Sequence, residues 1–110
     1  MVVDGITFAS RLEARRYAVL RDRAIEGRIR DLERQVAIIL QGQLGPILTP
    51  KGRPMRYIAD FRYLAGNREV LEDAKGFATD VFVMKRAILA AMGIEVHTIS
   101  TPDAPAGGAL

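Results

Sequence analysis

The sequence predicts one α/β domain with a mixed sheet, whose elements follow one another in the order α-β-β-β-α-β. Its 110 residues, about half of them apolar, are enough to form a single core. Two segments, residues 10–27 and 79–93, have apolar residues at helical spacing between an N-cap and a glycine. Four shorter segments have the β-branched or alternating pattern of strands: residues 35–40, 55–64, 69–77 and 94–99.

The first helix follows a short extended arm, Met1 to Ala9. Ser10 and Glu13 fit the capping-box pattern, in which the hydroxyl accepts from the third amide of the helix and the carboxylate reaches back to the cap. We expect the helix to end near Gly27. Its polar face is rich in arginine: Arg11, Arg15, Arg16, Arg21 and Arg23.

A loop of fourteen residues, 41–54, separates the first two strands and contains three prolines and three glycines. Loops of this length in small domains are usually functional or mobile. Lys51 and Arg53 lie in this loop. The second and third strands are separated only by the sequence AGNR, and Gly-Asn is a preferred pair at the centre of a hairpin turn.

The second helix can be capped by Thr79 or Asp80, and Gly93 suits the position that follows its end. One more strand brings the chain to Ile99. Residues 100–110 are mostly Pro, Ala and Gly. We therefore expect a single domain over residues 1–99 and a flexible C-terminal tail over residues 100–110.

The composition excludes several classes of protein. The absence of cysteine excludes a disulfide framework and a thiolate metal site. No apolar run approaches the ~20 residues that span a bilayer, and no secretory signal is visible, so we expect a cytoplasmic protein without a membrane partner. The net charge is +3, and thirteen of the sixteen basic residues are arginine, which suits bidentate phosphate contacts. This excess permits nucleic-acid binding and equally fits an ordinary solvated surface.

The strand "EVLEDAKGF", residues 69–77, carries more charge than strand interiors usually do. Because strand side chains alternate between faces, Asp73 and Lys75 share one face and Glu72 points to the other. If the central pair of the AGNR turn forms a two-residue hairpin loop, Asp60 of the preceding strand falls directly opposite Asp73. The two Cβ atoms would then be about 5 Å apart.

Two facing carboxylates in a half-buried sheet repel each other, and a hard divalent cation would remove the repulsion. Mg²⁺ binds one or two protein carboxylates together with waters and phosphate oxygens, and Mn²⁺ could replace it. Lys75 could hold a nucleophilic water or stabilise phosphate charge. These groups are the ones that metal-assisted phosphodiester hydrolysis requires. The alternative is a surface cluster of charges without chemistry.

Two other polar residues have simpler interpretations. Glu72 lies on the far face of its strand, where we expect it to be the structural partner of an arginine. His97 is the single histidine and has alternating apolar neighbours, as expected of an ordinary strand position. One histidine alone argues against histidine-based metal or relay chemistry.

The element order, with Asp60 on the second strand and Asp73-Ala74-Lys75 on the third, resembles the PD-(D/E)xK nuclease superfamily. The proline of that motif is absent, because Ala59 precedes Asp60. The blocks "DGITFASRLEARRY", "YIADFRY" and "VLEDAKGFATDVFVMKR" look like a family of small phage and prophage proteins placed in this superfamily. The resemblance covers about residues 4–99 and implies a restriction-endonuclease-like core.

The resemblance also implies roles for single residues. Asp60, Asp73 and the backbone carbonyl of Ala74 would bind the metal, and Lys75 would position or activate the attacking water. Glu13 matches an acidic residue of the first helix that joins the metal site in many members, although the capping box explains it without chemistry. Lys85 lies where members often carry a polar or basic residue that supports the site, and a core or surface role is equally open.

The sequence thus predicts a Mg²⁺-dependent endodeoxyribonuclease that acts on nicked or branched DNA, such as Holliday junctions, in phage recombination, repair or packaging. One site cuts one strand, so a double-strand cut or the resolution of a junction would need a homodimer. The alternative is a nuclease fold without activity that serves as a DNA-binding or assembly accessory. Five basic residues are expected to hold DNA phosphates without reading sequence: Arg11, Arg15, Arg16, Lys51 and Arg53.

Overall fold

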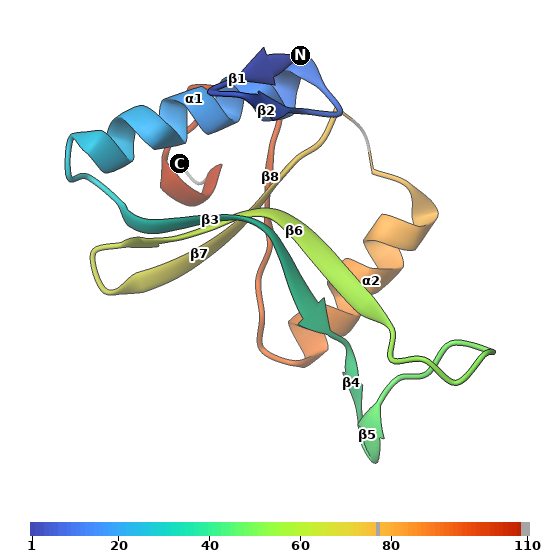
Figure 1. The fold of residues 1–110 in the computed structure, drawn as a ribbon. Coiled ribbons are helices and arrows are strands. Elements are labelled where there is room, and N and C mark those ends of the chain that lie inside the picture. The colour runs from blue at the N-terminus through green and yellow to red at the C-terminus, as the bar shows by residue number, and fades with distance from the viewer. Residues whose placement is uncertain (77, 109–110) are drawn as a thin grey trace.

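The computed structural model describes residues 1–76 and 78–108 of the chain. Its main layer is a four-stranded sheet in the order β3-β6-β7-β8, with helix α1 over the β6–β7 hairpin and helix α2 beside the other half of β6 (Figure 1). β3, β6 and β7 pair antiparallel, and β7 pairs with β8 in parallel. The main elements are α1 (Arg11–Ile25), β3 (Arg30–Ile39), β6 (Arg56–Ala65), β7 (Arg68–Ala74), α2 (Asp80–Ala91) and β8 (His97–Ile99). The predicted α/β class, mixed sheet and element order are therefore confirmed.

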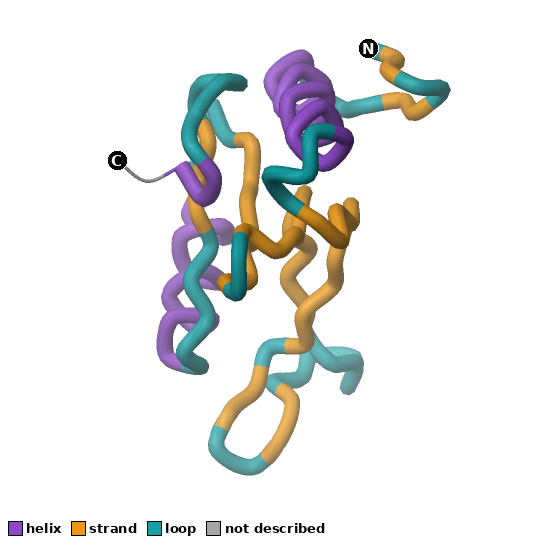
Figure 2. The backbone as a smooth tube through the Cα atoms, turned by 90° about the vertical axis from the view of Figure 1, so that its left-hand side faces the viewer, coloured by secondary structure: helices purple, strands orange, loops and turns teal. Residues whose placement is uncertain are grey.

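Two small hairpins and a final turn add to this order. β1 (Val2–Val3) and β2 (Ile6–Thr7) fold the N-terminal arm back on itself beside α1. β4 (Gln41–Gly42) and β5 (Gly45–Pro46) form an arm that extends away from the sheet in both views (Figures 1 and 2). A short 3₁₀ turn, η1, covers Ala106–Gly108.

The loop over residues 41–54 is thus more ordered than its Pro and Gly content predicted. At its base, the amide of Ile47 donates to the carbonyl of Leu40 (2.9 Å), and the amide of Met55 donates to the carbonyl of Ile47 (2.7 Å). Leu48 and Pro54 form a further bridge. These backbone bonds join residues that are not neighbours in sequence, which is why local composition did not indicate them.

The predicted starts of the two helices and the predicted hairpin turn are confirmed. Ser10 Oγ accepts from the amide of Glu13 at 3.1 Å, and Thr79 Oγ1 accepts from the amide of Phe82 at 3.1 Å, so each helix begins at its predicted cap. Gly93 follows the end of α2 with φ +82°, a conformation that favours glycine. Ala65 pairs with Arg68 across the turn, which confirms the two-residue hairpin loop.

Several strand boundaries differ from the prediction. β3 begins at Arg30, whereas the sequence predicted a start at residue 35. The prediction missed the first half of this strand because that half is polar and carries no apolar run. β8 begins at His97 rather than at residue 94. β7 ends at Ala74, before the predicted end at residue 77, and Phe77 lies outside the described residues.

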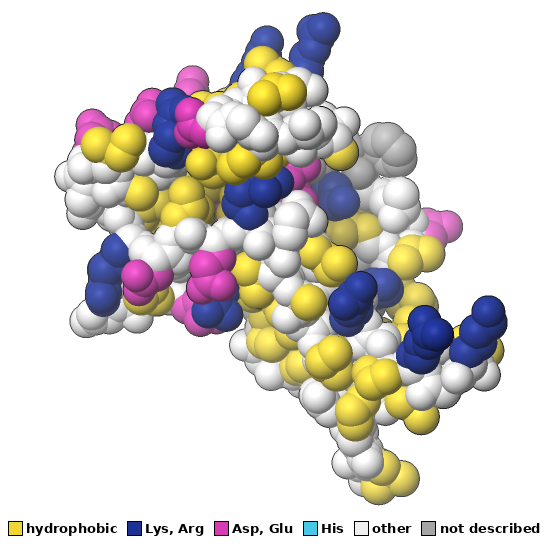
Figure 3. Space-filling view, viewed as in Figure 1, with side chains coloured by type: hydrophobic (Ala, Val, Ile, Leu, Met, Phe, Trp, Pro, Cys, Tyr) yellow, Lys and Arg dark blue, Asp and Glu magenta, His cyan; other side chains and the backbone are white. Residues whose placement is uncertain are grey.

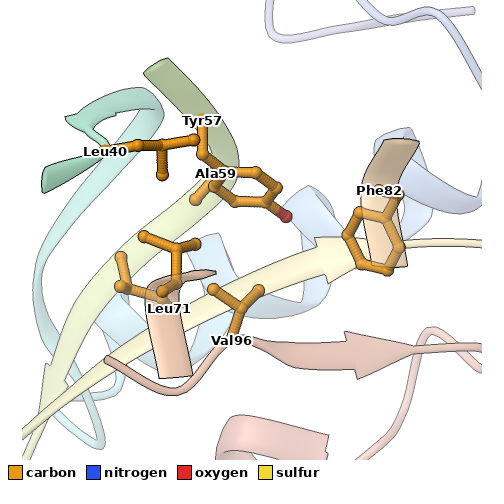
Figure 4. Packing of buried hydrophobic residues seen from close by; sticks show 7 residues of the cluster. Leu40, Tyr57, Ala59, Leu71, Phe82 and Val96 are labelled. Carbon is orange, nitrogen blue, oxygen red and sulfur yellow. The ribbon is translucent and has the colours of Figure 1, made fainter. Parts of the chain in front are cut away.

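The core has two parts, one for each helix. Leu71 and Val96 pack with Tyr57 and Phe82 on the α2 side, as Figure 4 shows. A second cluster lies under α1 and includes Leu20, Ile29, Phe61, Tyr63 and Val70. β6 contributes Tyr57 and Ala59 to the first part and Phe61 and Tyr63 to the second. Asp60 therefore lies at the point where β6 passes from one core to the other.

Backbone carbonyls of the C-terminal segment contact a side chain of helix α1. The Arg16 guanidinium, which is 0% exposed, donates to the carbonyls of Pro102 (2.9 Å), Ala104 (2.6 Å) and Pro105 (3.2 Å). The contacts are made by backbone carbonyls, so no side-chain pattern revealed them. Residues 109–110 lie outside the described part of the chain.

In the part of the chain that the structure describes, neither helix has the length and apolar character needed to cross a membrane.

Candidate functional site

The site lies where β6 and β7 separate. The last regular pair of this ladder is Phe61 with Glu72, so the next position places Asp60 opposite Asp73, as the predicted register requires. Here the two side chains replace the ladder: the amide of Asp60 donates to Asp73 Oδ1 (2.9 Å), and the amide of Ala74 donates to Asp60 Oδ2 (2.9 Å). The two carboxylates therefore end the strand pairing themselves.

Asp73 is the most deeply buried group of the site, with 1% of its surface exposed. Its Oδ2 atom has no hydrogen-bond partner among the described residues. Burial raises the pKa of Asp73 to about 6, although the amide of Asp60 and the positive charges of Lys75 and Arg86 act in the opposite direction. A buried carboxylate oxygen without a partner is unfavourable, and a cation beside it would relieve that cost.

Asp60 is less buried than Asp73, and its carboxylate lies between Gln35 of β3 and the amide of Ala74 of β7. Burial raises its pKa as well, and the hydrogen bond from Ala74 and the charge of Lys75 partly offset this. The positive charge of Lys75 lowers the pKa of both aspartates, as expected if its side chain shares their face. Its amide bonds to the carbonyl of Ile99 (3.1 Å), and its ammonium lies 5.0 Å from the centre of the Phe82 ring.

Gln35 is a site residue that the sequence analysis did not single out. It lies on β3 between the pairs that flank Asp60, and its Nε2 donates to Glu13 Oε2 (3.1 Å) and Asp60 Oδ1 (3.5 Å). Its φ of +53° is in the left-handed region, which costs a non-glycine residue about 1–2 kcal/mol. A glutamine at the head of an apolar run is ordinary, so only the register could have drawn attention to it.

Glu13 forms only half of the predicted capping box. Its amide donates to Ser10 Oγ, but its carboxylate turns away from the cap and accepts a hydrogen bond from Gln35, with Arg34 at 3.7 Å; the residue is 7% exposed. Burial and the negative charge of Asp60 raise its pKa. Within residues 1–76 and 78–108 no set of three His, Cys, Asp or Glu side chains is gathered to hold a metal ion. The predicted trio with Asp60 and Asp73 is thus not assembled, and the aspartate pair is the available donor set.

The second helix brings a different cation to the site than expected. Lys85 donates to the backbone carbonyl of Arg56 (3.0 Å) instead of approaching the aspartates. Arg86, the next residue, is the α2 cation whose charge lowers the pKa of Asp73. The structure therefore does not bring Lys85 into the group predicted to be catalytic.

Of the five predicted DNA contacts, Arg16 is the one that the structure removes. It is fully buried, where Nε donates to Glu72 Oε1 (2.8 Å) and Nη2 to Glu72 Oε2 (2.7 Å). This confirms that Glu72 is the partner of an arginine and explains why Arg16 cannot reach a phosphate. The other four predicted contacts are exposed: Arg11, Arg15, Lys51 and Arg53.

His97 lies in β8 beside Glu72 of β7, half-buried, with Nδ1 3.9 Å from Glu95 Oε1. It is not part of the aspartate pair.

The fold and this site define a small α/β domain with one buried and one half-buried aspartate at a break in its sheet. Residues 1–101 match the family described as "Protein of unknown function (DUF1064)", and the chain belongs to that family. No curated protein and no solved structure matches the chain.

Proposed function

We propose that this protein is a Mg²⁺-dependent endodeoxyribonuclease of the PD-(D/E)xK type. The observation that carries the proposal is the buried Asp73, whose Oδ2 has no partner in the described structure, next to Asp60 and under the charge of Lys75. The element order and the Asp73-Ala74-Lys75 triplet support it through the resemblance described above.

The donor set fits a hard divalent cation. Asp60 Oδ2 and Asp73 Oδ1 are engaged by backbone amides. The oxygens for a metal would be Asp73 Oδ2 and Asp60 Oδ1, which accepts only the long bond from Gln35 (3.5 Å). Mg²⁺ needs only one or two protein carboxylates, and Mn²⁺ is an alternative. The carbonyl of Ala74 could add a ligand, and Glu13 could act through a water. A bound Mg²⁺ would polarise the scissile phosphate and lower the pKa of the attacking water.

The protein side chains supply the remaining groups. The ammonium of Lys75 would stabilise the phosphate charge and orient the attacking water. Arg86 would help to keep Asp73 ionised. Because the pKa of Asp73 is about 6, this carboxylate is mostly ionised at neutral pH, and we expect metal binding and cutting to fall as the pH drops below that value.

The substrate is proposed to be nicked or branched DNA. The exposed side chains of Lys51 and Arg53 would contact phosphates, and phosphate contacts carry no base-sequence information. Cutting both strands, or resolving a four-way junction, would require a homodimer. We place this activity in the cytoplasm of a bacterium or of a phage-infected cell.

The test is a cutting assay on linear, nicked, single-stranded and four-way junction DNA, with Mg²⁺, Mn²⁺ or EDTA. Asp73→Asn and Lys75→Met should each reduce the rate by about 10²-fold or more. The matched control is Glu69→Gln, which removes an exposed carboxylate from the same strand and should keep activity.

Two results would count against the proposal. One is no metal-dependent cutting of any of the four substrates, and the other is cutting that survives both substitutions. Binding to branched DNA without cutting would instead support the alternative, an accessory protein that has kept the fold and lost the activity.

A further inference from the structure

A second concave surface lies at the foot of the β4–β5 arm, away from the aspartate pair. It is a pocket of about 550 Å³ between the loop after β5, the start of β6 and helix α2. Three cations line it, Arg53, Arg56 and Lys85, together with apolar side chains such as Ile39 and Met55. Figure 3 shows Lys and Arg side chains gathered over this part of the surface.

Hydrogen bonds to the backbone fix the turn that carries Arg53 and the ammonium group of Lys85. The amide of Arg53 donates to Thr49 Oγ1 (3.2 Å), its carbonyl accepts from the amide of Thr49 (2.7 Å), and this closes the tight turn that carries Arg53. On the opposite wall, Lys85 Nζ donates to the carbonyl of Arg56 (3.0 Å). The pocket is thus built from three separate elements of the fold.

The charges of the pocket are not compensated within the described structure. None of its three cations forms an ion pair with a carboxylate there, and no Asp or Glu lines the pocket. By contrast, Arg21 pairs with Asp4 and Arg62 with Glu33. A concave surface with three positive charges and no negative one attracts anions.

We propose that this pocket binds phosphate groups of a nucleic-acid strand, at a point separate from the aspartate pair. Arg56 and Asp60 lie on the same face of β6 and are four residues apart. At the rise of a β-strand this places the two points about 13 Å apart, which is about four nucleotides along one strand of B-form DNA. The DNA would then lie along β6 and α2, on the side of the arm.

The chemistry of the lining favours phosphate over a base. Ammonium and guanidinium groups only donate hydrogen bonds, so they match phosphate oxygens. Binding of an unstacked base normally uses an aromatic side chain, and the described lining contains none. The pocket should therefore hold the backbone of a strand without preference for its sequence.

The test measures binding of a fluorescent 20-base-pair duplex by anisotropy, in EDTA and at several salt concentrations. The variant is the double change Arg53→Gln and Arg56→Gln. Its control is the double change Arg28→Gln and Arg30→Gln, which removes the same charge from exposed residues at the far end of β3. A melting curve of each variant shows that it is folded.

We expect the pocket variant to bind about tenfold more weakly and the slope of log K against log salt to become shallower by about 2, since each lost phosphate contact changes it by about 0.9. The control variant should change affinity by less than about twofold. Equal binding by the two variants would overturn the proposal. If the double change does not fold, Arg53→Gln alone should shift the slope by about 1, and an unchanged slope would have the same meaning.

A competition arm separates DNA from a small phosphorylated ligand. Inorganic pyrophosphate that binds the wild type and not the pocket variant, with DNA affinity equal in both, would replace the proposed strand by a free ligand and overturn the inference. The inference depends on the proposed function only for the choice of DNA as the strand. Because binding is measured in EDTA, it can hold even if the cutting assay fails.

Discussion

Glu72 and Asp73 are adjacent buried acids on one strand, and they differ in how fully their oxygens are hydrogen-bonded. Glu72, 0% exposed, accepts two hydrogen bonds from Arg16, one from the hydroxyl of Tyr63 and one from the amide of Gly107 (3.0 Å). Asp73, 1% exposed, accepts one bond from an amide, and its second oxygen has no partner in the described residues. Alternation along β7 sends one to each face of the strand.

The comparison teaches how to separate a structural acid from a functional one when both are buried. A buried charge that is fully paired fixes the positions of its neighbours and leaves no atom for a ligand. A buried charge that is left partly unpaired is unfavourable for folding and available for binding. Four changes to the chain, from the largest expected effect to the smallest, test the surroundings of these two acids.

Arg16→Ala should have the largest effect. It would leave Glu72 buried without its cation, and breaking a buried pair in this way costs about 3–5 kcal/mol. Urea unfolding measures the loss. Arg21→Ala is the matched control on the same helix, because Arg21 pairs with Asp4 near the surface and its loss should lower stability far less. Similar losses for the two variants would show that the buried pair has no special role.

Asp73→Asn should stabilise the protein in EDTA at pH 8. The pKa of Asp73 is about 6 when folded against 3.8 for the ordinary group, so the unfolded chain loses its proton first as the pH rises. Stability therefore falls between these two pH values by up to about 3 kcal/mol, and Asn removes that fall.

Urea unfolding at pH 4 and pH 8 checks this expectation. The variant and the wild type should be equally stable at the lower pH and should diverge at the higher one. Added Mg²⁺ should stabilise only the wild type. A variant that is less stable than the wild type at pH 8 would contradict the view that Asp73 is unsatisfied.

Ending the chain after Thr101 tests whether the C-terminal segment stabilises the buried pair of Arg16 and Glu72. The change removes three carbonyl acceptors of Arg16 and the amide of Gly107, and water would replace only part of them. We expect a loss of about 2 kcal/mol, since hydrogen bonds to charged groups contribute about 1.5–3 kcal/mol each. Asp103→Ser with Ala104→Ser is the control and should cost little, because the contacts are made by the backbone. A shortened chain with full stability would mean that the tail does not support the pair.

The smallest effect concerns Gln35. Gln35→Gly should be more stable than Gln35→Ala by about 1 kcal/mol, because both remove the amide and only glycine tolerates a φ of +53° at no cost. At the neighbouring Ala37, a change to glycine should instead lose about 0.5–1 kcal/mol. Thermal melting of the three variants measures these differences in stability. If alanine is at least as stable as glycine at position 35, the backbone beside the aspartates is not strained.

The features that the sequence predicted correctly depend on residues that are close together in the chain. The helix caps at Ser10 and Thr79 and the turn at Gly66-Asn67 depend on neighbouring residues, and the turn alone determined the register that brings Asp60 and Asp73 together. Strand parity was enough to assign Glu72 to an arginine.

The remaining features depend on contacts between distant parts of the chain. Nothing near Arg16 distinguishes it from the exposed Arg15, since its burial depends on Glu72 and on carbonyls more than 80 residues away. The role of Gln35 follows from a backbone conformation, and that of Lys85 from the position of Arg56. Such partners become visible only when the fold is known.

The bonds that end the β6–β7 ladder have a practical consequence for spectroscopy. The amides of Asp60 and Ala74 each donate to a carboxylate of the aspartate pair, at 2.9 Å. Their ¹H–¹⁵N resonances should therefore move when a carboxylate gains a proton or a cation. Two backbone signals can then follow the titration and metal occupancy of the site directly, without a substrate and without labelled side chains.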